Sequence, residues 1–138
     1  MRLRRNQKVE LIKGVPLFSR CSRRELDEVA QLADEIDLPS GKEMTRQGQR
    51  GREFFVLLEG TADVQKDGRK INTLGEGDFF GEIALVSRAP RTATVVATSP
   101  VHALVITERS FRRLMERSPQ IQTKVLEALA ERLAPELV

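Results

Sequence analysis

Turn-forming residues recur at short intervals between residues 36 and 106, and this spacing constrains the fold more than any other feature of the chain. The glycine-containing segments LPSGKE, RQGQRGRE, LEGTA, KDGRK and LGEGD separate short runs whose residues are apolar or alternate in polarity. Short strands divided by frequent turns are typical of a sandwich, jelly roll or barrel. The sequence therefore predicts a mainly β fold, a β-roll or jelly roll, over this region.

Individual strands can be assigned within this region. ADVQKDGRKINTL predicts a hairpin, because Asp67-Gly68 favours a tight turn between two alternating segments. TATVVA and VHALVI predict two further strands on either side of Ser99-Pro100. His102 falls in the second of these strands, and we expect it to have a structural or surface role.

Helical patterns flank the predicted strands. CSRRELDEVAQLADE is the first clear helix, and Ser22 and Glu25 have the spacing of a capping box. ERSFRRLMER and the segment that begins at Ser118-Pro119 predict two helices after the strands. The last helix has an apolar stripe at steps of four residues, formed by Ile121, Val125, Leu129 and Leu133. We predict a single domain over 1–138, with N-terminal helices over about 1–35, the β-roll over 36–106 and C-terminal helices over 107–138.

Composition argues against several classes of protein. The longest apolar runs, such as Val101–Ile106, are too short to span a membrane, and no secretory leader is visible. The one cysteine, Cys21, cannot form an internal disulfide, which predicts a reducing, cytoplasmic location. A single histidine and a single cysteine argue against a transition-metal site, and the lone histidine also argues against a metal enzyme of the cupin type.

Basic residues concentrate near residues 2–5 and 109–117, and the formal net charge is +3. We interpret these clusters as solvated helix faces, with an acidic partner or a membrane surface as the alternative. A nucleic-acid-binding domain would combine such a patch with a reading helix or stacking aromatics. The chain has no Trp and no Tyr, so we expect no nucleic-acid-binding element.

The segment GDFFGEIALVSRAPRTATV, residues 77–95, places Glu82 and Arg91 around a short apolar run. The pair could form a surface salt bridge, or it could mark a site for a polar anion. A dinucleotide-binding fingerprint is excluded, because the third glycine of GEGDFFG follows the second by four residues where that motif needs three. We expect a short helical turn at 81–84, with free backbone N–H groups near Ile83 and Ala84 that face an anion.

A phosphate at this turn would need a cationic side chain, and guanidinium suits phosphate in charge and geometry. Arg91 begins a predicted strand and is the better candidate, whereas Arg88 lies in the intervening loop. The Glu82 carboxylate only accepts hydrogen bonds when ionised, so it suits a hydroxyl such as that of a ribose. Together these groups could bind a nucleotide.

The same segment resembles the phosphate-binding cassette of cyclic nucleotide-binding domains, in which F-G-E and a small apolar turn precede a loop and R-(T/S/A)-A-T-V. The matching residues here are Phe80–Leu85 and Arg91–Val95, so the cassette would cover 80–95. GVPLFSRCSRRELDEVA is similar to the leading helices of the family, and RSFRRLMERSPQI is similar to its hinge helix before the lid helix. The likeness covers nearly the whole chain and extends to the sensor domains of catabolite-activator-like and cyclic-nucleotide-gated-channel-like proteins in bacteria.

The resemblance implies a role for each matching residue. Glu82 would bind the ribose 2′-hydroxyl and Arg91 the exocyclic phosphate oxygens, while backbone N–H groups around Ile83 and Ala84 would hold the same phosphate. Thr92 matches a position that meets the phosphate and, in some relatives, the guanine amino group. The ligand-binding set is Gly81, Glu82, Ile83, Ala84, Arg91 and Thr92. Arg132 in the lid helix matches a position that reaches the purine in some bacterial relatives, and Leu129 and Leu133 are the alternative lid contacts.

The implied function is a cytoplasmic regulatory sensor that binds cAMP or cGMP and signals by rearranging its C-terminal helices. It would have no catalytic residue and no catalytic cofactor. The partner would be an effector protein or a fused effector domain. The sequence leaves open whether the chain forms a homodimer. The alternatives are a ligand-free protein-interaction domain, or the excised sensor part of a larger channel, enzyme or transcription regulator.

Overall fold

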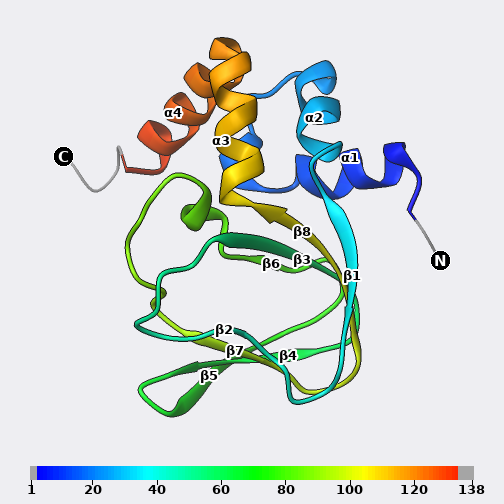
Figure 1. The fold of residues 1–138 in the computed structure, drawn as a ribbon, viewed down its shortest axis with the longest axis vertical. Helices are drawn as coiled ribbons and strands as arrows, with labels where there is room; N and C mark the ends of the chain where they lie inside the picture. The colour runs from blue at the N-terminus through cyan, green and yellow to red at the C-terminus, as the bar shows by residue number, and fades with distance from the viewer. Residues whose placement is uncertain (1–2, 134–138) are drawn as a thin grey trace. The chain divides into compact units, whose positions relative to one another are not determined.

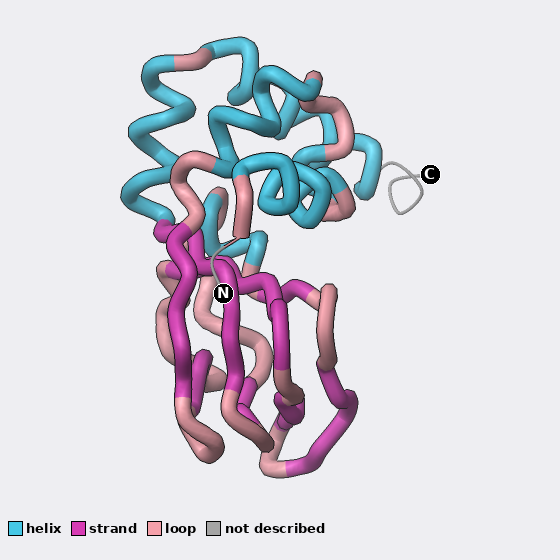
Figure 2. Tube along the Cα trace, turned by 90° about the vertical axis from the view of Figure 1, so that its right-hand side faces the viewer, coloured by secondary structure: helices cyan, strands magenta, loops and turns pink. Residues whose placement is uncertain are grey.

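The computed structural model describes residues 3–133, which fall into two compact units. Asp34–Glu108 forms one unit, and the described residues of Met1–Ala33 and Arg109–Val138 form the other. Figure 2 shows strands in the first unit and helices in the second. We call Asp34–Glu108 the β unit and the other part the helical unit.

The β unit contains two four-stranded antiparallel sheets (Figure 1). One sheet has the strand order β1-β8-β3-β6 and the other has the order β2-β7-β4-β5. The strands are β1 (Asp34–Leu38), β2 (Glu43–Thr45), β3 (Glu53–Glu59), β4 (Ala62–Lys66), β5 (Arg69–Leu74), β6 (Phe79–Phe80), β7 (Thr94–Ala97) and β8 (Val101–Thr107). This architecture confirms the predicted β-roll or jelly roll.

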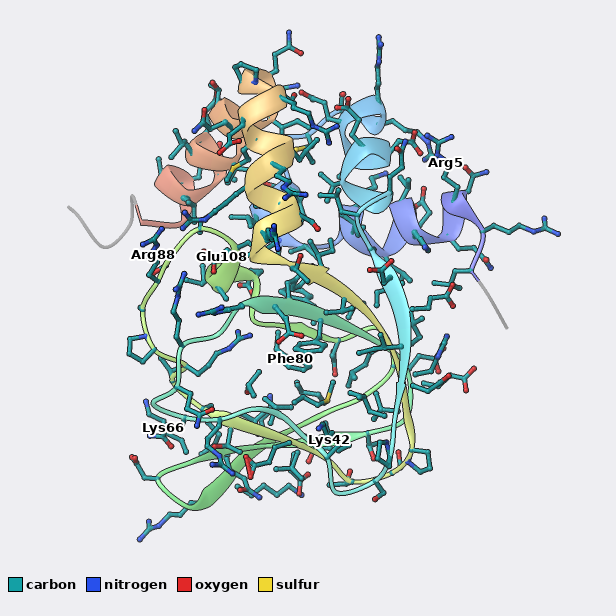
Figure 3. All side chains as sticks on the ribbon, in the orientation of Figure 1. Arg5, Lys42, Lys66, Phe80, Arg88 and Glu108 are labelled. Carbon is teal, nitrogen blue, oxygen red and sulfur yellow. The ribbon has the colours of Figure 1, made fainter. Side chains whose placement is uncertain are left out.

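Apolar side chains from both sheets form the core of the β unit. In the first sheet, β3 and β8 pair so that Leu57 lies opposite Ala103. Phe80 packs against the core cluster, and Figure 3 labels it between the two sheets. The buried members of the cluster are Leu57, Ala62, Leu74, Val95, Ala97, Val101 and Ala103. Strands from distant parts of the sequence are therefore joined by one apolar layer.

The β4–β5 hairpin is present as predicted. Its turn residues have left-handed backbones, with φ of 53° at Asp67 and 78° at Gly68. Positive φ at both central residues matches the right-handed twist of the flanking strands. Gln47 reinforces the turn, because its Nε2 donates to the Asp67 carboxylate and its Oε1 accepts from the Asp67 N–H, each at 2.9 Å.

The helical unit begins with α1 (Arg5–Lys13), the short 3₁₀ helix η1 (Pro16–Phe18) and α2 (Arg23–Ala30). Ser22 and Glu25 form the predicted capping box at the start of α2. The predicted helix over residues 21–35 is too long, because α2 ends at Ala30 and β1 already begins at Asp34. Asp34 pairs with Val105 of β8, so pairing with a distant strand outweighs the local helical pattern.

The C-terminal helices are α3 (Glu108–Arg117) and α4 (Pro119–Leu133). Pro119 is the first residue of α4, as the sequence predicts. Ile121 and Val125 of the apolar stripe are buried, and Leu129 is half-buried. The side chains of Arg132 and Leu133 lie outside the described residues. Within residues 3–133, every helix is too short or too polar to cross a membrane.

Candidate ligand-binding site

The β unit contains a cavity of about 380 Å³ beside the 80–95 segment. A volume of this order is within the range of about 300–1,000 Å³ that is usual for small-molecule sites. The structure brings all six residues of the predicted ligand-binding set to this cavity. Its full lining is Thr45, Val64, Leu74, Phe80, Gly81, Glu82, Ile83, Ala84, Ser87, Ala89, Pro90, Arg91, Thr92, Ala93 and Val95.

A short 3₁₀ helix, η2 (Glu82–Leu85), forms one side of the cavity. Gly81 precedes it with a left-handed φ of 85°, a conformation that glycine adopts without strain. The Ala84 N–H donates to the Gly81 carbonyl at 3.0 Å, so our expectation that this N–H is free was wrong. Tight i→i+3 bonding explains the difference, because it already pairs the N–H of Ala84, the third residue of the turn.

Arg91 reaches the cavity from a segment that is not itself a strand. We expected Arg91 to begin a strand, but β7 begins three residues later at Thr94. The neighbouring β2–β3 loop supports its backbone instead: the Arg91 N–H donates to the Gln49 carbonyl at 2.8 Å, and the Gly48 N–H donates to the Arg91 carbonyl at 2.9 Å. The long-range contact thus replaces the strand that the local pattern predicted.

The Arg91 guanidinium is half-buried and has acidic neighbours. Its Nη2 donates to the backbone carbonyl of Glu53. Burial lowers the pKa of Arg91, while the carboxylates of Glu53 and Glu82 act in the opposite direction. Arginine stays protonated at physiological pH despite such shifts, so the site holds a fixed cation next to the Glu82 carboxylate.

Two glycines lie against the Arg91 side chain. A Cβ atom on Gly51 would lie 2.5 Å from Arg91 Cδ and closer still to Nε and Cζ. A Cβ atom on Gly81 would lie 2.5 Å from Arg91 Nη1 and 2.8 Å from the Glu53 carbonyl oxygen. We name this space the Arg91 slot: it is formed by Gly51, Gly81 and the Glu53 carbonyl.

The cavity also has an apolar wall, formed by Val64, Leu74, Phe80 and Val95. Thr45, which is buried, lines the cavity from β2, and its Oγ1 donates to the Ala93 carbonyl at 3.2 Å. An apolar wall beside a carboxylate, a guanidinium and a helical turn suits a ligand with one flat apolar part and one anionic part.

Some candidates lie elsewhere, and some lining residues were not predicted. Arg88 is exposed in the loop after η2 and does not line the cavity. Leu129 belongs to the helical unit. The sequence contains no local signal for Thr45, which lines the cavity, or for Gly51 and Glu53, which do not line it but contact the Arg91 side chain. Among residues 3–133, no three His, Cys, Asp or Glu side chains are grouped to hold a metal ion.

The sequence of this chain is similar to those of known proteins. Residues 35–118 match the cyclic nucleotide-binding domain. The chain is 35% identical over 115 residues to a cAMP-dependent protein kinase regulatory subunit of Mycosarcoma maydis, covering 77% of this chain and 22% of that protein. It is 33% identical over 123 residues to a cyclic nucleotide-gated potassium channel of Rhizobium etli, covering 89% of this chain and 34% of that protein.

A solved structure shares the fold across most of the chain. The N-terminal domain of a transcriptional regulator from Streptomyces coelicolor A3(2) superposes with a TM-score of 0.80 at 26% identity, covering 91% of this chain and 94% of that domain. The chain spans only 22% and 34% of the lengths of the kinase subunit and the channel. With its two antiparallel sheets, its 80–95 segment beside one cavity and this sequence match, the chain belongs to the cyclic nucleotide-binding domain family.

Proposed function

We propose that this domain binds a cyclic nucleoside monophosphate, cAMP or cGMP, in the cavity beside residues 80–95. The observation that carries the proposal is that the η2 turn, which begins with Glu82, and Arg91, nine residues after Glu82, line one cavity with an apolar wall. The names of two relatives, a cAMP-dependent kinase subunit and a cyclic nucleotide-gated channel, support this ligand class.

Arg91 and the η2 turn bind the cyclic phosphate in this proposal. A guanidinium carries five N–H donors, so Arg91 can keep its hydrogen bond to the Glu53 carbonyl and still donate to the exocyclic oxygens. The Ile83 N–H belongs to the first turn of η2 and contributes a further donor, whereas the Ala84 N–H contributes only if it exchanges the Gly81 carbonyl for the phosphate.

Glu82 and Thr92 recognise the rest of the nucleotide. The Glu82 carboxylate accepts a hydrogen bond from the ribose 2′-hydroxyl, which offsets the unfavourable effect of its charge on a nearby phosphate. Thr92 is exposed and lines the same cavity, and its hydroxyl binds the phosphate or the 2-amino group of guanine in this proposal. The apolar wall packs against the purine.

We further propose that ligand binding is reported through α3 and α4, as hinge and lid helices. A ligand moves such a helix only if it binds the lid-closed state more tightly than the open state. Leu129, Arg132 and Leu133 are the proposed lid contacts to the base. The domain then regulates a cytoplasmic effector protein or a fused effector domain and carries out no catalysis itself.

Calorimetric titration of nucleotide-free protein with cAMP, cGMP and 5′-AMP tests the binding. We expect a dissociation constant of about 1 μM or lower for one cyclic form and little binding of 5′-AMP. Folded, nucleotide-free protein that binds none of the three would contradict the proposal and would favour a protein-interaction domain. Hydrogen exchange tests the signalling: unchanged exchange in α3 and α4 at saturating cyclic nucleotide would refute helix rearrangement.

A further inference from the structure

Gly51 is buried in the β2–β3 loop and has no backbone reason to be glycine. The glycines with left-handed φ in the described chain do not include Gly51. Glycine costs conformational entropy relative to alanine where the backbone does not need it. Some other contact must therefore account for the absence of a side chain at this position.

That contact is with the side chain of Arg91. The three nearest atoms to a Cβ on Gly51 are Arg91 Nε, Cζ and Cδ, and all three lie far inside van der Waals distance. An alanine at this position and the observed Arg91 side chain cannot occupy the same space. Arg91 therefore takes its observed position because residue 51 has no side chain.

The Arg91 slot holds the guanidinium on its other sides as well. Gly81 lies against Nη1, and the Glu53 carbonyl accepts a hydrogen bond from Nη2. A free arginine side chain has up to about 2 kcal/mol of rotamer entropy to lose on binding. A side chain held in a slot before the ligand arrives has already lost part of that entropy.

We propose that Gly51 is a positioning residue for the binding of the cyclic phosphate, and that it acts through Arg91 without contacting the nucleotide. Its missing side chain leaves the space in which the Arg91 guanidinium is held before binding. The inference rests on the proposed function and adds to it a residue outside the 80–95 segment that determines affinity for the phosphate.

A double-mutant cycle in ligand-free protein tests the packing. Gly51→Ala is expected to lower the midpoint of urea unfolding in the parent, but to leave it unchanged or raise it in Arg91→Ala, where the competing side chain is absent. Gly75→Ala is the matched control, because a Cβ there meets no atom within 4 Å and its φ is not left-handed. Equal effects of Gly51→Ala in both backgrounds would overturn the proposal.

The cycle also covers the case in which Gly51→Ala alone does not fold. Folding that is restored by adding Arg91→Ala would show that the clash with Arg91 caused the failure, which supports the proposal. A double variant that stays unfolded, while Arg91→Ala alone folds, would show that alanine is incompatible with the loop itself and would overturn it.

Titration with cAMP and cGMP then tests the positioning role. Gly51→Ala is expected to weaken binding by at least about tenfold, but to cause no further loss in the Arg91→Ala background. Gly75→Ala should bind as tightly as the parent. Undiminished affinity of Gly51→Ala would overturn the inference. Failure of the parent to bind any cyclic nucleotide would instead overturn the proposed function, and the ligand-free cycle would still report on the packing.

Discussion

Arg50 and Glu108 connect the loop that supports Arg91 to the first residue of α3. The Arg50 Nη2 donates to both carboxylate oxygens of Glu108, at 3.0 Å and 3.2 Å, and the Glu108 side chain is only 7% exposed. The Glu108 N–H donates to the Arg52 carbonyl at 2.8 Å, and Arg50 forms a backbone bridge with Pro90. The loop that supports the Arg91 backbone therefore also contacts the first residue of α3.

Arg50→Ala is expected to destabilise the domain, because it removes a partner from a buried carboxylate. We expect a loss of about 1–2 kcal/mol in the free energy of urea unfolding, reduced from the fully buried case because Arg50 is itself partly exposed. Arg46→Ala is the control, since Arg46 and its partner Glu43 are both exposed. Equal losses in the two variants would refute a special role for the Arg50–Glu108 pair.

Arg91→Ala and Arg88→Ala form a matched pair, because only Arg91 lines the cavity. Truncating a partner of a hydrogen-bonded charge pair costs about 2–5 kcal/mol, or roughly thirtyfold to several-thousandfold in affinity. We expect a calorimetric loss of this size for Arg91→Ala and near-parental affinity for Arg88→Ala. Parental affinity in Arg91→Ala would remove the phosphate role assigned to Arg91.

Glu82 can be tested with a change in the ligand. The parent should bind cAMP more tightly than 2′-deoxy-cAMP, since the analogue lacks the hydroxyl proposed to donate to Glu82. In Glu82→Ala the two ligands should bind with similar affinity, because the hydrogen-bond acceptor is absent. The same preference for the hydroxyl in parent and variant would show that another group recognises the ribose.

Thr92→Ala tests base preference, since Thr92 lines the cavity and is exposed. We expect the variant to lose more affinity for cGMP than for cAMP, because only guanine presents a 2-amino group to the hydroxyl. The comparison uses the ratio of the two dissociation constants in parent and variant. An unchanged ratio would remove the guanine contact and leave only a contact to the phosphate.

The surroundings of His102 lead us to expect a pH dependence of stability that is separate from ligand binding. Its Nε2 lies 2.9 Å from Glu35 Oε1 and its Nδ1 lies 2.8 Å from Asp37 Oδ1, and hydrogen bonding to Glu35 and then Asp37 raises the pKa of His102. Because the pKa of His102 is higher in the folded state, the protonated side chain stabilises the fold, and this stabilisation is complete below the unfolded-state pKa of about 6.5. This stability is lost as the pH rises through the folded-state pKa.

The free energies of unfolding of the parent and of His102→Gln, compared between about pH 5 and pH 9, measure this contribution of His102 to stability. The stability advantage of the parent should be greatest at the acid end and shrink as the pH rises. An advantage that is constant or grows with pH would contradict the assignment of a protonated His102 between the two carboxylates.

The sequence predicted the parts of the fold that depend on local residues. Asp67-Gly68 fixes a hairpin because both residues adopt left-handed backbones, and Ser22 with Glu25 fixes the start of α2. The end of α2 was missed, because Asp34 is placed by pairing with Val105, which is distant along the chain. Local pattern contains no information about which distant strand will pair.

At the site too, local residues could be predicted from the sequence, whereas contacts between distant segments could not. Residues 80–95 follow one another in sequence, so their resemblance to a known cassette could be recognised, and most of them line one cavity. The support for Arg91 comes from Gly48, Gln49 and Glu53, which approach it only after the loop has folded. Gly51 looked like any other turn glycine, because its packing against Arg91 is a property of the tertiary structure.

A crystal structure of the domain with bound cAMP would show whether the nucleotide occupies the cavity beside residues 80–95. We expect the cyclic phosphate between the Arg91 guanidinium and the start of η2, the ribose 2′-hydroxyl on Glu82, and Arg91 still between Gly51 and Gly81. A nucleotide that lies outside the cavity, or whose phosphate points away from Arg91, would contradict the proposal.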